Sequence, residues 1–353
     1  GAQADRHDRR RLLLADQVAL VVTAGLLALG AILGEPPVLV LYVLGGLLAG
    51  FAAVQNVLRS AILPNLVAPE LVNPAIALNF GLTQLTYVVG PGLGGVMIGL
   101  AGVGAAYTIQ AVTCLAMVAA AAAMSPQPPI GLEPGAGPRE PVLHSIAEGL
   151  RFVRRNNALL GSFAIDLLAM TFGMPRALFA VLAVSVYGAG AEGTGLLYAS
   201  VAAGATVAAL TTGWLAHARR LGRITIYAVG AWGAAIALAG VAGSLWVAAA
   251  LLAVAGAADS VSAVCRSAIN QDVTPDRLRG RMSSVFMLVV ASGPRLGDVE
   301  AGTVAALTSV RFSVVSGGIA CLAGVALVVL AFPALAKYDA HVQREPEPQP
   351  APV

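Results

Sequence analysis

The chain has 353 residues, of which 58% are hydrophobic and only 11% are charged, and its mean hydropathy is +0.82. An average soluble domain carries about 25% charged residues, so a water-soluble globule is excluded. The net charge of +3 is too small to indicate a nucleic-acid-binding surface. The apolar residues form long uninterrupted blocks, which predict helices that cross a lipid bilayer.

Ten spanning helices are predicted when about 20 apolar residues are taken for each crossing. In chain order they cover 16–34, 38–60, 75–99, 104–124, 157–186, 190–216, 223–242, 245–268, 282–307 and 311–334. Glycine is abundant, with 40 residues, and small residues let membrane helices approach closely. The sequence therefore predicts an all-α polytopic membrane protein.

The polar segments predict an orientation. The longest, 125–156, begins rich in Pro and Gly and ends amphipathic, so we expect a linker with an interfacial helix between two halves. The tail, 335–353, is predicted to be disordered. Threading the spans alternately puts 18 of the 21 Lys and Arg residues on one side. The positive-inside rule makes that side cytoplasmic, so linker and tail are expected in the cytoplasm of a cell-membrane protein.

An internal repeat relates the two halves. Arg-Ser-Ala-Ile at 59–62 recurs at 266–269, and Gly90-Pro91 recurs as Gly293-Pro294, with the copies 203 to 207 residues apart. Ordered matches at nearly one offset indicate parallel repeats. If the second half begins near residue 157, its partner would begin about 50 residues before the given sequence, so we expect two further crossings there, twelve in all. Two parallel six-helix halves are the plan of the major facilitator transporters.

Three motifs carry a resemblance to the major facilitator superfamily. The segment 1–11 is similar to the family's loop between helices 2 and 3, Gly-x-Leu-Ala-Asp-Arg-x-Gly-Arg-Arg, and 213–220 looks like a weakened copy. The segment 90–95 resembles the Gly-Pro-x-x-Gly-Gly signature of family exporters. Within the family the chain resembles the drug and siderophore exporter branch, which includes enterobactin exporters. The resemblance implies that 1–124 holds the equivalents of helices 3 to 6 and 157–334 holds a complete six-helix half.

The resemblance also implies gating and hinge residues. The expected gating residues are Gly1, Asp5, Arg9, Arg10, Gly213, His217 and Arg219. The expected hinge residues of the antiporter-like motif are Gly90, Pro91, Gly94, Gly95, Gly293 and Pro294. A carboxylate such as Asp5 gains roughly 0.3–1 kcal/mol at a helix N-terminus, and the resemblance suggests the helix entered at 283–284 as its partner. The alternatives are that the basic cluster only fixes orientation and that the glycines only pack.

Charged residues within predicted spans need a reason, because each costs about 2.5–3.5 kcal/mol at a helix centre. The candidates for binding a proton or substrate are Glu300, Asp166, Asp298, Arg295, Arg176 and Asp259. Arg295 and Asp298 are three apart and can pair locally, which leaves Glu300 as the first candidate for a titrating carboxylate. Asp166 comes next, and Asp259 with Arg266 is expected to gate or anchor. A buried structural ion pair is the alternative reading for these charges.

Several aromatic residues could line a cavity, although most are expected to pack or to anchor the chain at the interface. They are Phe163, Phe172, Phe179, Tyr187, Tyr198 and Trp232. We assign none of them as a ligand on sequence alone.

These observations together predict a secondary active transporter that exports a drug-like molecule or a siderophore by proton antiport with alternating access. A metabolite or sugar importer of the same fold and a non-transporting receptor or scaffold are the alternatives. An enzyme would need clustered His, Asp or Ser at membrane depth, and the sequence has no such cluster, so we expect no enzyme, no cofactor and no metal. The expected partners are a small-molecule substrate, protons and the lipid bilayer, and we expect a monomer.

Overall fold

The computed structural model describes residues 8–34, 36–126, 142–275 and 278–339. Within these ranges the regular structure is helical, without strands, as the sequence predicts. Eight segments of this described part are long and apolar enough to cross a membrane. Contacts divide the chain into two compact units: residues 1–86 with 93–138 form the first, and residues 87–92 with 139–353 form the second.

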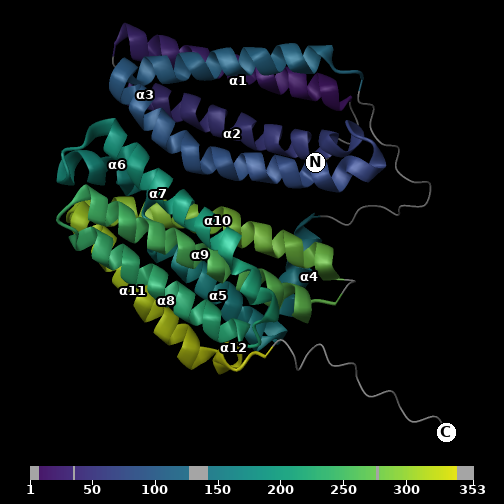
Figure 1. Cartoon of the computed structure of the whole chain (residues 1–353), viewed down its shortest axis with the longest axis vertical. Helices are drawn as coiled ribbons and strands as arrows, with labels where there is room; N and C mark the ends of the chain where they lie inside the picture. The colour runs from purple at the N-terminus through teal and green to yellow at the C-terminus, as the bar shows by residue number, and fades with distance from the viewer. Residues whose placement is uncertain (1–7, 35, 127–141, 276–277, 340–353) are drawn as a thin grey trace. The chain divides into compact units, whose positions relative to one another are not determined.

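The first unit contains α1 (Arg9–Leu33), α2 (Val38–Ile62) and all of α3 (Val72–Ala123) except residues 87–92 (Figure 1). Two short 3-10 turns, η1 (Leu63–Asn65) and η2 (Pro69–Leu71), lie between α2 and α3. Helix α1 begins seven residues before its predicted start at 16, because Asp8 caps it by accepting a hydrogen bond from the Arg10 backbone N–H at 2.9 Å. Leu13, Leu58, Ile62 and Ala121 form the small core of this unit.

Helix α3 covers two of the predicted crossings. Its backbone is non-helical at Gly102, with φ of 80° and ψ of 170°, inside the link predicted between 99 and 104. Glycine adopts this positive φ without a steric penalty. Pro91 lies within α3, and the helix continues on both sides of it.

The second unit is larger. Its elements are α4 (Val142–Arg155), α5 (Asn157–Phe172), η3 (Arg176–Leu178), α6 (Phe179–Val181), the π-helix η4 (Leu182–Val186), α7 (Gly190–Thr211), η5 (Thr212–His217), α8 (Leu221–Val241), α9 (Leu245–Val273), α10 (Arg279–Leu307), α11 (Val310–Ala331) and α12 (Pro333–Ala336). Helix α9 packs against both α7 and α8, and α8 also packs against α11, as seen in Figure 1.

Glycines bring α7 and α9 into backbone contact at two reciprocal positions. A Cβ atom on Gly204 of α7 would lie 1.8 Å from the Ala253 carbonyl oxygen of α9. One on Gly256 of α9 would lie 2.0 Å from the Val201 carbonyl oxygen of α7. These distances leave no room for any side chain, so the two helices are fixed at the closest approach that membrane helices use.

The predicted span 157–186 matches one membrane-length segment, Asn157–Val186, but its helix is interrupted, because α5 stops at Phe172. Pro175 has no N–H and disfavours helical backbone at Met174, and the helical path resumes only at η3. Two side chains satisfy the backbone at this break. The Tyr198 hydroxyl donates to the Arg176 carbonyl oxygen at 2.8 Å, and the Ala177 N–H donates to Asp298 Oδ1 at 3.1 Å.

The loop before α7 is fixed by Tyr187, which lies between two spans. Its hydroxyl is within 3.3 Å of the Ala239 carbonyl oxygen and 3.2 Å of the Ala242 carbonyl oxygen, at the end of α8. Burial raises the pKa of this phenol, an effect that the positive charge of Arg311 partly offsets. Tyr187 therefore remains a hydrogen-bond donor at neutral pH.

Candidate functional site

A buried ion pair joins α5 to α9 in the second unit. Arg266 Nη2 lies 2.8 Å from Asp166 Oδ1, and the two side chains are only 5% and 2% exposed. The contact is ionic, because no N–H is directed at Oδ1 well enough for a hydrogen bond. The other terminal nitrogen of Arg266 donates to Ser262 Oγ at 2.6 Å. Both partners lie in helical segments long and apolar enough to cross a membrane, Asn157–Val186 and Leu245–Val273.

A second carboxylate stands beside this pair. Asp259 is seven residues before Arg266 on α9, about two helical turns. Its Oδ1 atom is buried and has no hydrogen-bond partner in the described ranges. The positive charges that act on Asp259 are those of Arg266 and Arg176. Asp259 also acts electrostatically on Asp166, so the four groups form one coupled cluster of two acids and two cations.

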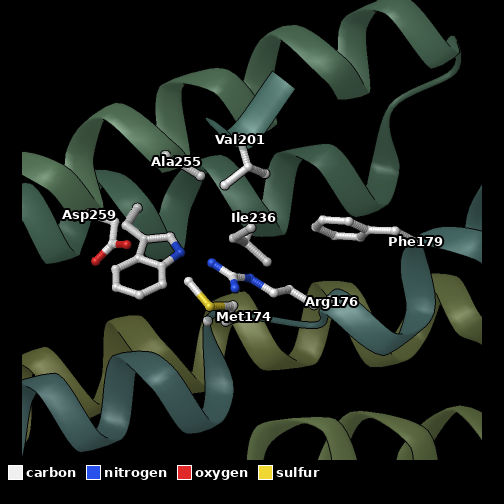
Figure 2. A pocket seen from close by; sticks show the side chains of 10 residues that line it. Met174, Arg176, Phe179, Val201, Ile236, Ala255 and Asp259 are labelled. Carbon is white, nitrogen blue, oxygen red and sulfur yellow. The ribbon is translucent and has the colours of Figure 1, made fainter. Parts of the chain in front are cut away.

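A small space lies between Asp259 and the break in α5 (Figure 2). It is lined by Gly173, Met174, Arg176, Phe179, Val201, Trp232, Ile236, Ala255, Gly256 and Asp259. Figure 2 shows the Arg176 side chain reaching between Met174 and Ile236, with Asp259 at the opposite end from Phe179. A water-sized sphere can move its centre through about 10 Å³ of this space, which is room for about one water molecule. We call it the α5-break pocket.

A second space of the same size lies along the ion pair. It is lined by Ser162, Phe163, Asp166, Arg266, Asn270 and Phe286, from α5, α9 and α10. The pair is thus sealed between helices yet adjoins room for about one water molecule.

The structure separates the remaining charged candidates from this cluster. The expected local pair of Arg295 with Asp298 is wrong: these two do not pair in the described chain, and Asp298 instead accepts from the Ala177 N–H. An open N–H at a helix break is a fixed donor, whereas Arg295 is exposed. Glu300 is half-buried on α10 and lines neither pocket. Its proton role remains a prediction.

The two copies of the Gly-Pro motif have different surroundings. A Cβ on Gly293 would lie 2.8 Å from Met170 Cβ, and one on Gly297 would lie 2.6 Å from the Met170 carbonyl oxygen. A Cβ on Gly94 would meet nothing within 4 Å. The second copy, with Pro294 inside α10, therefore packs against the last turn of α5. Gly90, Pro91 and Gly95 lie in α3, and their hinge role remains a prediction.

The expected gating residues are only partly visible. Gly1 and Asp5 lie outside the described residues. Arg10 binds the end of α3 by donating from Nε to the Ala121 carbonyl oxygen at 3.1 Å and from Nη2 to the Ala122 carbonyl oxygen. Arg9 begins α1 and is buried. Gly213 and His217 lie in η5, and Arg219 is exposed just after it.

Ser262 and Met174 are site residues that the sequence analysis missed. Ser262 precedes Arg266 by four residues, the spacing at which helical side chains meet, and this spacing could have predicted the contact. The sequence Gly173-Met174-Pro175 combines two helix-breaking residues. It could have predicted the break that places Met174 in the pocket.

A bundle of membrane-length helices with a broken helix beside buried charges defines a polytopic α-helical membrane transporter. Over residues 1–352 the chain matches the family described as transmembrane secretion effector, and it belongs to this family of major facilitator transporters. The transporter class and the all-α fold predicted from the sequence are confirmed by this match. The protein is not an enzyme.

Curated relatives of the chain are enterobactin exporters. EntS of Citrobacter koseri is 30% identical over 360 residues, covering 100% of this chain and 83% of the relative. EntS of Shigella boydii serotype 18 is 30% identical over 338 residues, covering 94% of this chain and 78% of the relative. Among solved structures, a bacterial homologue of the human lysosomal transporter Spinster, in an inward-facing and unoccupied conformation, shares the fold. Its TM-score is 0.57 at 13% identity, and the match covers 99% of this chain and 86% of that one.

Proposed function

We propose that the protein exports a small organic compound across the cell membrane, by alternating access and in exchange for protons. The export direction is supported by membership of the transmembrane secretion effector family and by relatives named as enterobactin exporters. A siderophore is therefore the first cargo to test, and a drug-like molecule is the second. The observation that carries the coupling is the buried Asp166–Arg266 pair with Asp259 beside it.

The charge balance of the cluster explains how a proton could drive transport. The buried charges of the cluster are Asp166, Asp259 and Arg266, whereas Arg176 is exposed. One negative charge is in excess among the buried groups, so one added proton would neutralise it, and its loss would leave an unpaired charge that costs several kcal/mol among apolar helices. The bundle could remove that cost after proton release by rearranging until the carboxylates meet water. Protonation would thus favour one of two states that differ in exposure.

We also propose how the chain is organised around this cluster. The segments 1–124 and 157–334 are parallel repeats of one bundle, with 125–156 and the tail on the cytoplasmic side. The segments 1–11 and 213–220 act as cytoplasmic gates. Arg10, at the start of α1, donates hydrogen bonds to the end of α3, and these support a locking role for the first segment, since they would have to break whenever that helix end moves.

Proton-driven efflux from vesicles tests the proposal. The purified protein is reconstituted into lipid vesicles, and the vesicles are loaded with enterobactin. An inward proton gradient is then applied, and the release of enterobactin is measured. We expect Asp166→Asn and Asp259→Asn to abolish the response to the gradient, whereas Glu192→Gln, an exposed acid on α7, should preserve it. Gradient-driven release that persists in both aspartate variants would refute the assignment of proton coupling to Asp166 and Asp259. Loss of the response in Glu300→Gln alone would instead assign proton coupling to Glu300.

A further inference from the structure

Helix α1 of the first unit carries two adjacent polar residues that are buried. The Asp16 side chain is only 6% exposed and the Gln17 side chain is 0% exposed. Both carboxylate oxygens of Asp16, and both the oxygen and the nitrogen of the Gln17 amide, lack a hydrogen-bond partner within the described ranges. Buried polar atoms are almost always satisfied in folded proteins. These open atoms on consecutive residues therefore mark a position at which a further group binds.

The surroundings of Asp16 on α1 are apolar. The buried residues nearest to this polar pair along the helix are Leu13, Leu20 and Ala24. Helix α1 is long and apolar enough to cross a membrane, and Asp16 lies seven residues after its first residue, Arg9, which is about 10 Å along the helix axis. An isolated ionised carboxylate is very costly in such surroundings and becomes neutral instead. Asp16 therefore needs either a cation or a proton.

The helices of the first unit supply no cation to Asp16 in the described part of the chain. Besides Asp16, the charged and titratable residues of α1, α2 and α3 in this unit are Arg9, Arg10, Arg11, Tyr42, Arg59, Tyr107 and Cys114. Asp16 makes no ion pair with any of them. Arg11 and Arg59 are exposed, and Arg10 is bound to the end of α3. Arg9 lies two turns towards the N-terminus, which is also the direction in which helical side chains lean.

Helix α3 closes one side of the site. Arg10 donates hydrogen bonds to the last turn of α3, and a Cβ atom on Gly104 of α3 would lie 2.9 Å from Ile32 Cγ1 near the end of α1. These contacts show that the two segments run antiparallel along each other. Cys114 lies between them in sequence, and the charge of Asp16 acts on its thiol. Because a thiol is only a weak hydrogen-bond donor, Cys114 cannot compensate an ionised carboxylate.

We infer that Asp16 is a proton-binding site of the first unit, separate from the cluster around Asp166 and Asp259. A bound proton makes Asp16 a neutral carboxylic acid, which removes the charge from its apolar surroundings. Release of the proton requires water at the carboxylate. The open amide of Gln17, which can both donate and accept, binds that water beside Asp16.

This inference rests on the proposed proton exchange and sets its stoichiometry. The cluster in the second unit takes up one proton, according to the charge balance of its buried groups. With Asp16, each transport cycle moves two protons for each cargo molecule. Every proton contributes the same free energy from the gradient, so the second proton drives export against a steeper concentration difference of the cargo.

Covalent labelling with dicyclohexylcarbodiimide tests for the protonated form of Asp16 on the full chain in lipid nanodiscs. This apolar reagent reacts with protonated carboxyl groups inside the membrane. The acid proton moves to a nitrogen of the reagent, and the carboxylate oxygen bonds to the central carbon of the reagent. Mass spectrometry of the digested protein then locates the adduct. At neutral pH we expect the adduct on Asp16 and not on Glu192, an exposed acid of α7.

Thr23→Val is the matched control for labelling. Thr23 is also a buried polar residue of α1, seven residues after Asp16 and so on the same side of the helix. Its hydroxyl is satisfied, because it donates to the Ala19 carbonyl oxygen at 2.7 Å. Removing this hydroxyl should leave the labelling of Asp16 unchanged. Absence of the adduct from Asp16, or equal labelling of Asp16 and Glu192, would overturn the inference.

The ratio of protons taken up to enterobactin released from reconstituted vesicles tests the stoichiometry. Asp16→Asn keeps the shape of the neutral acid but cannot bind the proton, so it should halve this ratio. Thr23→Val should keep the ratio of the wild type. An unchanged ratio in Asp16→Asn would overturn the inference. If Asp16→Asn does not fold, the labelling experiment still decides, because it is made on the wild type.

Failure of this inference is distinguishable from failure of the proposed function. An adduct on Asp16 in a protein that shows no gradient-driven release would retain the proton-binding site and remove the proposed antiport. Gradient-driven release of enterobactin by a protein that forms no adduct on Asp16 would retain the antiport and remove the site.

Discussion

The Asp166–Arg266 pair makes a quantitative prediction about stability. Removing one partner of a buried ion pair costs about 3–5 kcal/mol, because the remaining charge is left uncompensated. Both side chains are at most 5% exposed, so solvent does not screen this cost. Asp166→Asn keeps the shape and removes the charge. However, Asp259 acts on the same guanidinium, and it can take over part of the compensation. We therefore expect Asp166→Asn alone to cost roughly 2 kcal/mol, about half of the full penalty.

A double-mutant cycle isolates the contribution of Asp259. In an Asp259→Asn background, adding Asp166→Asn leaves no carboxylate of the cluster to compensate Arg266, so this second substitution should cost the full amount of about 3–5 kcal/mol. The coupling energy between the two sites should be about 1–3 kcal/mol, within the range for residues of one network.

Unfolding of the purified protein in mixed micelles, followed by far-ultraviolet circular dichroism, measures all four corners of this cycle. Glu192→Gln serves as the exposed control and should change the unfolding free energy by less than about 0.5 kcal/mol. Additivity of the two aspartate substitutions within about 0.5 kcal/mol would show that they do not share Arg266, and it would refute the four-group cluster.

Three further predictions concern packing and backbone contacts. Gly204→Ala should lower the unfolding free energy by about 1–3 kcal/mol, because its Cβ would overlap the α9 backbone, and a lower thermal midpoint would show this. The control Gly230→Ala, with open space around its Cβ, should leave the thermal midpoint unchanged. Tyr198→Phe should lower the unfolding free energy by about 1 kcal/mol, since the Arg176 carbonyl oxygen loses its hydrogen-bond donor; an unchanged unfolding free energy would mean that this contact does not stabilise the break. Arg10→Ala should speed amide hydrogen exchange in the last turn of α3, and an unchanged rate would show that its two hydrogen bonds are not maintained.

Much of the fold could be predicted because lipid imposes strong constraints on sequence. A spanning helix needs about 20 apolar residues, and such blocks stand out between Pro, Gly and charge. The break at Gly102 falls within the predicted link, because glycine adopts the positive φ found there without a steric penalty. The family could likewise be recognised from short motifs, at 1–11, 213–220 and 90–95.

The site was less predictable, since its contacts join residues far apart in the chain. Asp166 and Arg266 are a hundred residues apart, and no periodicity relates them. The local pair of Arg295 with Asp298 was expected because spacing alone favoured it. That expectation is wrong, since the fold offers Asp298 a backbone N–H at the break in α5. Helical spacing shows which side chains of one helix can contact each other. Packing against the other helices determines which of these contacts form.

The break in α5 links the packing of the second unit to its chemistry. Gly297 brings the α10 backbone against the Met170 and Thr171 carbonyl oxygens, one turn before the break, while Asp298, the next residue, binds the N–H just after it. One turn of α10 therefore holds both sides of the interruption, and any sliding of α10 would move both α5 segments. Because Asp166 lies before the break and Arg176 after it, such sliding would change the distance between these two charged residues, and with it the electrostatic balance at Asp259, on which Arg176 and Arg266 both act.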